Sequence, residues 1–167
     1  MSSQSGADIS DCGRYRYALW RVWDPSQKLL NFVLLNPSTA DAEQSDATLT
    51  KCVTRAQMLG FGGIHVTNLY ALRSRDPSVL RRDPNPIGPD NDIHITVAAR
   101  RCALVVCGWG IHAEDGCVGR AAQVQKLLYS AGRQPYVLGL TKGGHPRHPL
   151  YVAYSCAPQR WTGSDTR

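Results

Sequence analysis

The 167-residue sequence has no long hydrophobic run and little lysine. Its apolar stretches are far shorter than the ~20 residues that a membrane-spanning helix needs. The polar N-terminus, MSSQSGADISDCG, has no signal-peptide core, so we expect a cytoplasmic protein that does not engage a membrane. Only four of the nineteen basic residues are lysines, so arginine carries most of the +6 net charge. Arginine-rich charge suits a phosphate-bearing partner, although it is equally compatible with a basic protein that is merely soluble.

Several motifs of metal and nucleotide chemistry are also missing. The six cysteines form no C-x-x-C pair and no His/Cys spacing typical of zinc, so we expect free thiols, several of them buried, and no metal or other cofactor. An iron–sulfur cluster is the alternative left open. No G-x-G-x-x-G or G-K-[ST] follows a predicted strand, which argues against a Rossmann or P-loop protein. No cysteine lies in a setting that would activate it as a nucleophile.

Strand-like and helical patterns alternate along the chain. Four short apolar segments bounded by turn residues indicate buried strands, and the segments between them carry apolar residues at helical spacing. The expected strands are residues 28–37, 62–72, 102–110 and 135–140, and the expected helices are residues 48–60, 93–101 and 119–132. This alternation predicts an α/β fold of three αβα layers around a central, mostly parallel four-stranded sheet.

The N-terminal part predicts one more element. Residues 14–23 alternate as a strand, and the turn signal DPSQ follows them. We therefore expect this strand to form a β-hairpin with the strand at 28–37. One domain is expected at residues 14–157, between a flexible N-terminus at 1–13 and a C-terminal tail at 158–167.

Each of the four predicted central strands ends in polar or aromatic residues. Ligands of parallel sheets bind beyond the carboxyl ends of the strands. The segments at those ends are NPSTAD, NLYALR, GWGIHA and GGHPRHP. Their convergence predicts an active site at this edge of the sheet.

Four motifs in this order resemble those of the uracil-DNA glycosylase superfamily. Asn36-Pro37-Ser38 resembles the N-P-G form of the first motif, as in the mismatch-specific and single-strand-selective branches. The other three are VTNL, ending the second strand; VVCGWG with His112-Ala113, similar to L-W-G-x-x-A; and HPRHPL, similar to the H-P-S-P-L loop. The set covers roughly residues 30 to 152. The chain also resembles bacterial and phage proteins that carry N-P-S-T-A-D, N-L-[FY]-A-L-R and P-x-G-P-x-N-D and have no assigned activity.

The superfamily resemblance implies catalytic roles for four side chains. Asn36 would hold the attacking water, with Asp41 or Asp46 of the same loop as a base. His145 would donate a hydrogen bond to the departing base, but the loop is one residue longer than H-P-S-P-L, so His148 is an equal candidate. Without the resemblance, Asn36 is a turn residue at a strand end and the two histidines are solvated loop residues.

The resemblance also implies contacts with the base and with DNA. Ser38, Asn68 and Trp109 would line the base pocket; the alternative for Asn68 is a buried amide that bonds loop backbone. Leu150 or Tyr151 lies where the superfamily places an apolar wedge that enters the base stack. The side chains expected to contact phosphates are Arg73, Arg75, Lys142 and Arg147.

One departure from the superfamily predicts the substrate. Uracil-specific members place a tyrosine after their first motif, where its ring excludes substituents at C5, whereas Ser38-Thr39-Ala40 are all small here. We therefore expect a monomeric, monofunctional DNA glycosylase that flips out a 5-substituted pyrimidine and leaves an abasic site, in DNA repair or defence against phage. Hydroxymethylated or glucosylated cytosines of phage DNA are the expected class. The alternatives are a non-catalytic DNA-binding module of the same fold and an enzyme that modifies bases or nucleotides.

Overall fold

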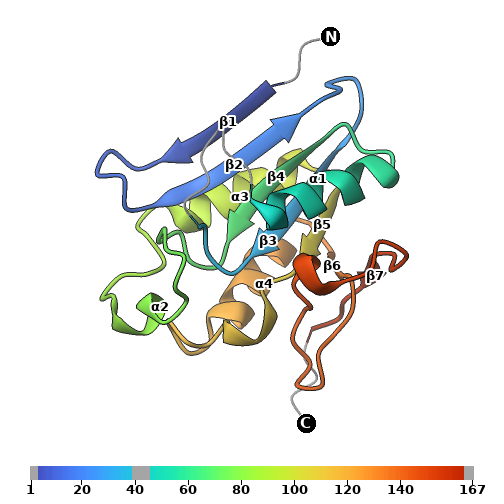
Figure 1. Ribbon diagram of the computed structural model, residues 1–167. Helices are drawn as coiled ribbons and strands as arrows, with labels where there is room; N and C mark the ends of the chain where they lie inside the picture. The colour runs from blue at the N-terminus through green and yellow to red at the C-terminus, as the bar shows by residue number, and fades with distance from the viewer. Residues whose placement is uncertain (1–3, 39–45, 164–167) are drawn as a thin grey trace.

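The computed structural model describes residues 4–38 and 46–163. Within these residues, seven strands form one mixed sheet in the order β1-β2-β4-β3-β5-β6-β7 (Figure 1). The strands are β1 (Gln4–Ile9), β2 (Arg16–Val22), β3 (Leu29–Leu34), β4 (Gly63–Asn68), β5 (Leu104–Cys107), β6 (Pro135–Val137) and β7 (Gln159–Arg160).

The centre of the sheet consists of the four strands that the sequence predicts. β4, β3, β5 and β6 are neighbours in this order, and each pairs in parallel with the next. The sheet is nevertheless larger than the predicted four strands, because β1, β2 and β7 extend it with antiparallel pairings. The carboxyl ends of β3, β4 and β5 all lie at one edge of the sheet (Figure 1).

The predicted pairing of the N-terminal hairpin is wrong. β2 pairs with β1 and β4, whereas β3 lies beyond β4 in the sheet. β3 buries side chains on both of its faces, Phe32 against one helix layer and Val33 against the other, so it occupies the centre between two parallel neighbours. The hairpin partner of β2 is β1, which lies within the residues expected to be a flexible N-terminus.

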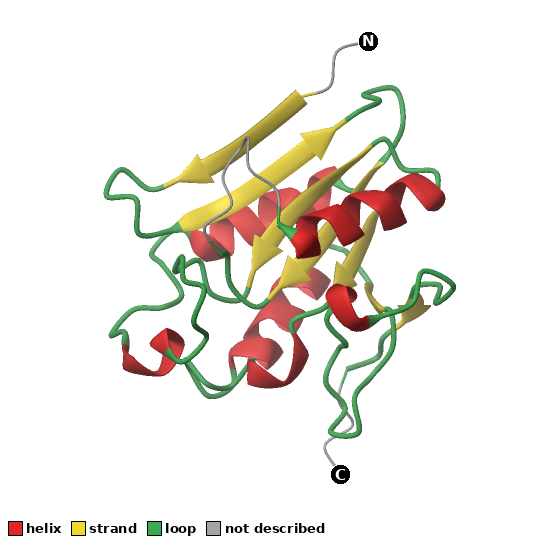
Figure 2. Cartoon of the chain, viewed as in Figure 1, coloured by secondary structure: helices red, strands yellow, loops and turns green. Residues whose placement is uncertain are grey.

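Helices cover both faces of the sheet (Figure 2). α1 (Ala47–Met58) packs Cys52 and Ala56 onto Phe32 in one core. α3 (Asn91–Arg101) and α4 (Arg120–Ser130) pack on the other face, where Ile95 and Val124 belong to the second core. The short helices are α2 (Val79–Arg82), η1 (Gly110–His112) and η2 (Pro149–Tyr151). The α/β class and the helices on both faces are confirmed.

The predicted C-terminal tail contributes to the core. β7 pairs with β6, and the Trp161 ring that follows is 4% exposed and packs edge-on against Trp109, with ring centroids 5.5 Å apart. All six cysteines are free, as expected, and Cys52, Cys102 and Cys107 are buried. In the part of the chain described here, no helix has the length and apolar character needed to cross a membrane.

Candidate active site

Two adjoining hollows lie at the carboxyl ends of the central strands. The small hollow measures about 70 Å³ and the large hollow about 570 Å³. Both are lined by Asn36, Thr48 and His148, which separate the two spaces. The small hollow is also lined by Arg16, Leu34, Ser38, Asp46, Leu49, Val66 and Asn68. The large hollow is also lined by Leu35, Pro77, Trp109, Gly110, Ile111, His112, Thr141, Arg147, Leu150 and Tyr151.

Asn68 brings a buried amide to the small hollow. It is the last residue of β4 and is only 2% exposed, and its Nδ2 has no hydrogen-bond partner among the described residues. The loop backbone at this strand end is held instead by Asn91, whose amide donates to the carbonyls of Asn68 (2.9 Å) and Leu69 (3.1 Å). A buried donor without an acceptor costs about 1–3 kcal/mol. The Asn68 donor is therefore a group that a bound ligand can satisfy.

Asn36 is fixed by its own amide nitrogen. Nδ2 donates to the carbonyls of Ser74 (3.1 Å), Leu72 (3.3 Å) and Pro37 (3.3 Å). These bonds tie the loop that follows β3 to the segment after β4, and they orient the side chain so that Oδ1 is left as an acceptor. An acceptor of fixed direction at the boundary between the hollows is suited to holding a water molecule.

His148 presents a neutral imidazole to both hollows. The backbone N–H of Leu150 donates to its Nδ1 (3.3 Å), so in the neutral ring the proton is on Nε2. Burial lowers the pKa of His148 below its ordinary value of 6.5, and the nearby Asp46 carboxylate opposes that shift. The ring also lies against Tyr151, with centroids 5.9 Å apart. At neutral pH the Nε2–H group is thus a hydrogen-bond donor.

His145 occupies a different position. It lines neither hollow, and its backbone N–H donates to the hydroxyl of Thr141 (3.2 Å). Of the two candidate histidines, the structure therefore places His148 with Asn36 and Asn68.

The acidic side chain that reaches the small hollow is Asp46, at the start of α1. Its Oδ1 accepts from the backbone N–H of Leu49 (2.9 Å), which caps the helix, and its Oδ2 accepts from the hydroxyl of Ser38 (2.7 Å). Ser38 thus lines the hollow with its hydroxyl already engaged. Asp41, the other candidate base, lies outside the described residues.

Arg16 is a site residue that the sequence did not suggest. It is 3% exposed and lines the small hollow from β2. The alternation in RYRYALW gave no signal for it, because a register shift in the β1–β2 pairing, where Asp8 pairs with Ala18 and Ile9 with Arg16, interrupts the alternation at Tyr17. Bulges of this kind re-aim a side chain, and the sequence pattern does not reveal them.

The loop that begins at Trp109 forms one wall of the large hollow and is held in place by hydrogen bonds. Trp109 is 2% exposed and begins this loop, and Gly110 takes a positive φ of 77° as its N–H donates to Pro146 O (2.8 Å). Behind it, the Tyr70 hydroxyl donates to Ala113 O and accepts from the backbone N–H of Cys117 (3.0 Å).

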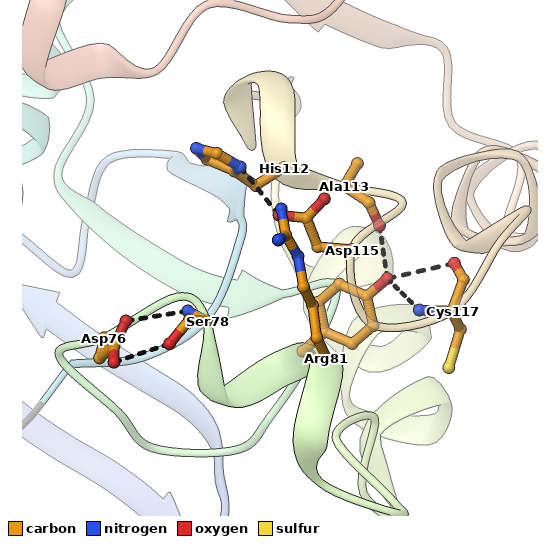
Figure 3. A network of polar contacts seen from close by, with 8 residues as sticks. Asp76, Ser78, Arg81, His112, Ala113, Asp115 and Cys117 are labelled. Atoms are coloured by element: carbon orange, nitrogen blue, oxygen red, sulfur yellow. Dashed lines mark hydrogen bonds and ion pairs between the residues drawn. The ribbon is translucent and has the colours of Figure 1, made fainter.

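A second set of bonds ties the same loop to α2 (Figure 3). Asp115 accepts from Arg81 (3.1 Å) and lies 2.9 Å from the His112 ring nitrogen. Just before α2, Asp76 accepts from the hydroxyl (2.7 Å) and N–H (3.0 Å) of Ser78, and these bonds lower the pKa of Asp76. His112, which lines the large hollow, and Arg81 are thereby held by the same carboxylate.

The residues expected to contact DNA divide into two groups. Arg147, Leu150 and Tyr151 line the large hollow; Tyr151 is 74% exposed, and the Arg147 guanidinium donates to its carbonyl (3.1 Å). The other three cations lie outside both hollows: Arg73 donates to Gly13 O (3.3 Å), and Arg75 and Lys142 are exposed.

A third and larger hollow, of about 790 Å³, lies at the opposite edge of the sheet; we call it the amino-edge hollow. Its cationic lining residues are Lys28, Arg101 and Arg133, and no carboxylate is among the described residues that line it. His65 and Trp20 stack there, with ring centroids 5.6 Å apart. Elsewhere, no group of three or more His, Cys, Asp or Glu side chains in residues 4–38 and 46–163 is arranged to hold a metal ion.

Comparison with known proteins identifies the family of the chain. Residues 16–150 match a family described as proteins of unknown function, DUF1643. Neither the curated proteins nor the solved structures gave a match. The matched segment begins at Arg16 and ends at Leu150, so it includes all the residues that line the small hollow. By this match over most of its length, the chain belongs to the DUF1643 family of proteins of unknown function.

Proposed function

We propose that this protein is a monofunctional DNA glycosylase that flips out a modified pyrimidine, hydrolyses its N-glycosidic bond and leaves an abasic site. One observation carries the proposal: Asn36, Asn68 and His148 come from three separate segments and line two adjoining hollows at the carboxyl edge of the sheet. The same order of motifs, on four parallel strands flanked by helices, supports a uracil-DNA glycosylase-like fold.

Each of these side chains has a chemical task in base release. The extruded base enters the large hollow and turns its polar edge toward the small hollow, where the Asn68 amide offers a donor for a pyrimidine carbonyl. Asn36 Oδ1 holds the water that adds to C1′. The C1′–N1 bond breaks, and its electron pair stays on the base, so negative charge grows where the Nε2–H of His148 donates.

Protons and atoms balance without a cofactor. The water oxygen bonds to C1′, and its proton passes to the Asp46 carboxylate at the same hollow and then to solvent. The released base anion takes up a proton from solvent. The products are the abasic sugar and the free base, with one water molecule consumed.

The size of the large hollow supports an enlarged pyrimidine. Beyond Asn36 and His148 it offers about 570 Å³, and the residue that follows Pro37, Ser38, is a small side chain that lines the adjoining small hollow. A substituent at C5 of the base therefore has space, as the small residues of NPSTAD led us to expect; Thr39 and Ala40 lie outside the described residues. Hydroxymethylated or glucosylated cytosine in phage DNA remains the proposed class, with a role in DNA repair or phage defence.

The proposed DNA contacts surround the same opening. Tyr151 is exposed beside the large hollow and is the better candidate for the wedge, because Leu150 is half-buried. Arg147 at the rim and the exposed Arg75 and Lys142 would contact phosphates.

The direct test is a panel of duplex oligonucleotides that differ only in one central pyrimidine. We expect alkali-labile abasic sites with 5-substituted pyrimidines and fewer or none with plain uracil. Asn36→Ala and His148→Ala should each lower the single-turnover rate by about 10²–10³-fold. His145→Ala is the matched control and should retain the wild-type rate.

Two results would overturn the proposal. If no duplex releases a base but all are bound with a steep salt dependence, the protein is a DNA-binding module without this chemistry. If free nucleotides are altered and DNA is not, the alternative of a nucleotide-modifying enzyme holds.

A further inference from the structure

We propose that Arg16 stabilises the negative charge of the departing base, as the cationic element of a site in which the neutral His148 donates a hydrogen bond. This inference rests on the proposed function. It assigns a catalytic contact to a residue in none of the four sequence motifs, and it is carried by the burial of Arg16 in the small hollow together with Asn68 and His148.

The fold places Arg16 there through a local irregularity of β2. Leu19 belongs to the core under α1, whereas Tyr17, two residues earlier, belongs to the core under α3 and α4. In a regular strand, residues two apart share a face. The shift in register with β1 removes that regularity, and the backbone N–H of Arg16 then donates to Ala71 O (2.9 Å) at the loop after β4. The side chain of Arg16 thus reaches the hollow that Asn68 lines.

Two other arginines, Arg55 and Arg120, are as deeply buried. Arg55 donates to the carbonyls of Val152 (2.9 Å) and Ala153 (3.1 Å), and so holds the chain after η2. Arg120 donates to Leu69 O (2.8 Å) and Asp92 (2.7 Å). Neither of them lines the hollows at the carboxyl edge. Arg16 alone among these three combines deep burial with access to the site.

The chemistry of glycosidic cleavage gives such a guanidinium a function. When the C1′–N1 bond breaks, the electron pair left on N1 spreads onto the carbonyl oxygens of the base. A guanidinium keeps its charge at any physiological pH, so it stabilises the anion without transferring a proton. Because Arg16 is buried, its attraction to a negative charge in the hollow is several-fold stronger than in bulk solvent. His148 stays neutral and donates one hydrogen bond, so Arg16 supplies the positive charge that the histidine lacks.

The dependence of rate on leaving-group acidity tests this assignment. Duplexes that carry one of a series of 5-substituted uracils would be cleaved under single-turnover conditions, from 5-fluorouracil, which leaves most readily, to 5-hydroxymethyluracil. We expect Arg16→Gln to slow the poorest leaving group by about 10²-fold and the best by less than about 10-fold. The plot of log rate against the pKa of the free base should therefore be steeper for Arg16→Gln than for the wild type. Arg16→Lys keeps the positive charge but loses the planar guanidinium, so the slope of its plot should lie between those of the wild type and Arg16→Gln.

Controls separate this inference from the proposed function. Arg55→Gln should shift all rates by the same factor, since its contacts are structural. The wild-type plot should be shallower than that of the spontaneous reaction in buffer, a comparison that needs no variant. If the wild type releases bases but its plot is parallel to that of Arg16→Gln, the role of Arg16 is overturned while the proposed function stands. Equal slopes for the wild type and the spontaneous reaction overturn the role of Arg16 too. No release from any duplex overturns the proposed function, and this inference with it.

Discussion

The two edges of the sheet differ in a way that separates a candidate site from a hollow of structural origin. The amino-edge hollow is the larger, about 790 Å³ against about 570 Å³, and three cations line it. It also holds His65, whose pKa is lowered by burial and by the charge of Arg101. Size, positive charge and a perturbed histidine are therefore present at both edges and do not by themselves identify the site.

The difference lies in how the polar groups are arranged. At the amino edge, Arg133 is engaged by the end of α3, since it donates to Ala99 O (2.8 Å) and Arg100 O (2.8 Å). At the carboxyl edge, an amide, an imidazole and a carboxylate from separate segments border one space of about 70 Å³. Donors and acceptors that converge on one point can recognise the edge of a base, whereas a row of cations attracts any anion.

The largest effect is expected for a substitution at the carboxyl edge, and a substitution at the amino edge provides the comparison. Asn68→Ala should lower base release by about 10²–10³-fold, because the base edge loses its donor. Arg101→Gln at the amino edge should leave the single-turnover rate with saturating enzyme unchanged. Thermal unfolding of Asn68→Ala should stay near the wild-type midpoint, because the substitution also removes a buried amide nitrogen without a partner. Loss of activity with Arg101→Gln and not with Asn68→Ala would reverse the comparison.

A smaller effect is expected from pH. Burial depresses the pKa of His148, so the neutral ring persists down to pH values below 6.5. Protonation at Nδ1 below the depressed pKa removes the acceptor for the Leu150 N–H and disturbs the loop. Single-turnover rates should thus be level from pH 8 to 6.5 and fall only at lower pH, provided that binding is saturated throughout. An acid limb with its midpoint above pH 6.5 would contradict a half-buried His148 whose pKa is lowered.

The smallest effect should come from the rim of the large hollow. Tyr151→Ala removes an exposed ring that can fill the gap left by an extruded base. We expect about a 10-fold loss on duplex DNA and little change on single-stranded DNA, where no base stack has to be opened. Tyr129→Ala is a matched control, since Tyr129 is also exposed but lies on α4. Equal losses of activity on duplex and single-stranded DNA would mean that Tyr151 contributes to DNA binding in general and not to opening the base stack.

The sequence predicted the elements whose periodicity is local. The four central strands, the helices at α1, α3 and α4, and the placing of Asn36, Asn68 and Trp109 at strand ends followed from runs of apolar residues and their stops. β1 was not predicted, because QSGADI has no apolar pattern and is held by main-chain pairing with β2. Pairing partners far apart in the chain leave no local signal.

The residues of the candidate site could be predicted only in part, because contacts between distant parts of the chain bring some of them there. The loop HPRHPL offered two histidines, and the tertiary structure distinguishes them, because His148 lines both hollows and His145 lines neither. Arg16 depends on a register shift between β1 and β2, and Trp161 reaches the core only after β7 pairs with β6. Sequence reasoning therefore found the residues at strand ends and missed those that a bulge or an edge strand brings in.

The indole N–H signals in a ¹H–¹⁵N spectrum provide the most direct test, because tryptophans lie in both regions. Trp109 lines the large hollow and Trp20 the amino-edge hollow. The protein would be titrated with two duplexes that differ only in one central nucleotide, an unmodified cytidine or a non-cleavable 2′-fluoroarabino analogue of a 5-hydroxymethylated one. We predict that the modified duplex shifts the Trp109 signal beyond what the unmodified duplex does, while the Trp20 signal is the same with both. A difference at Trp20 with none at Trp109 would contradict a base-binding site at the carboxyl edge.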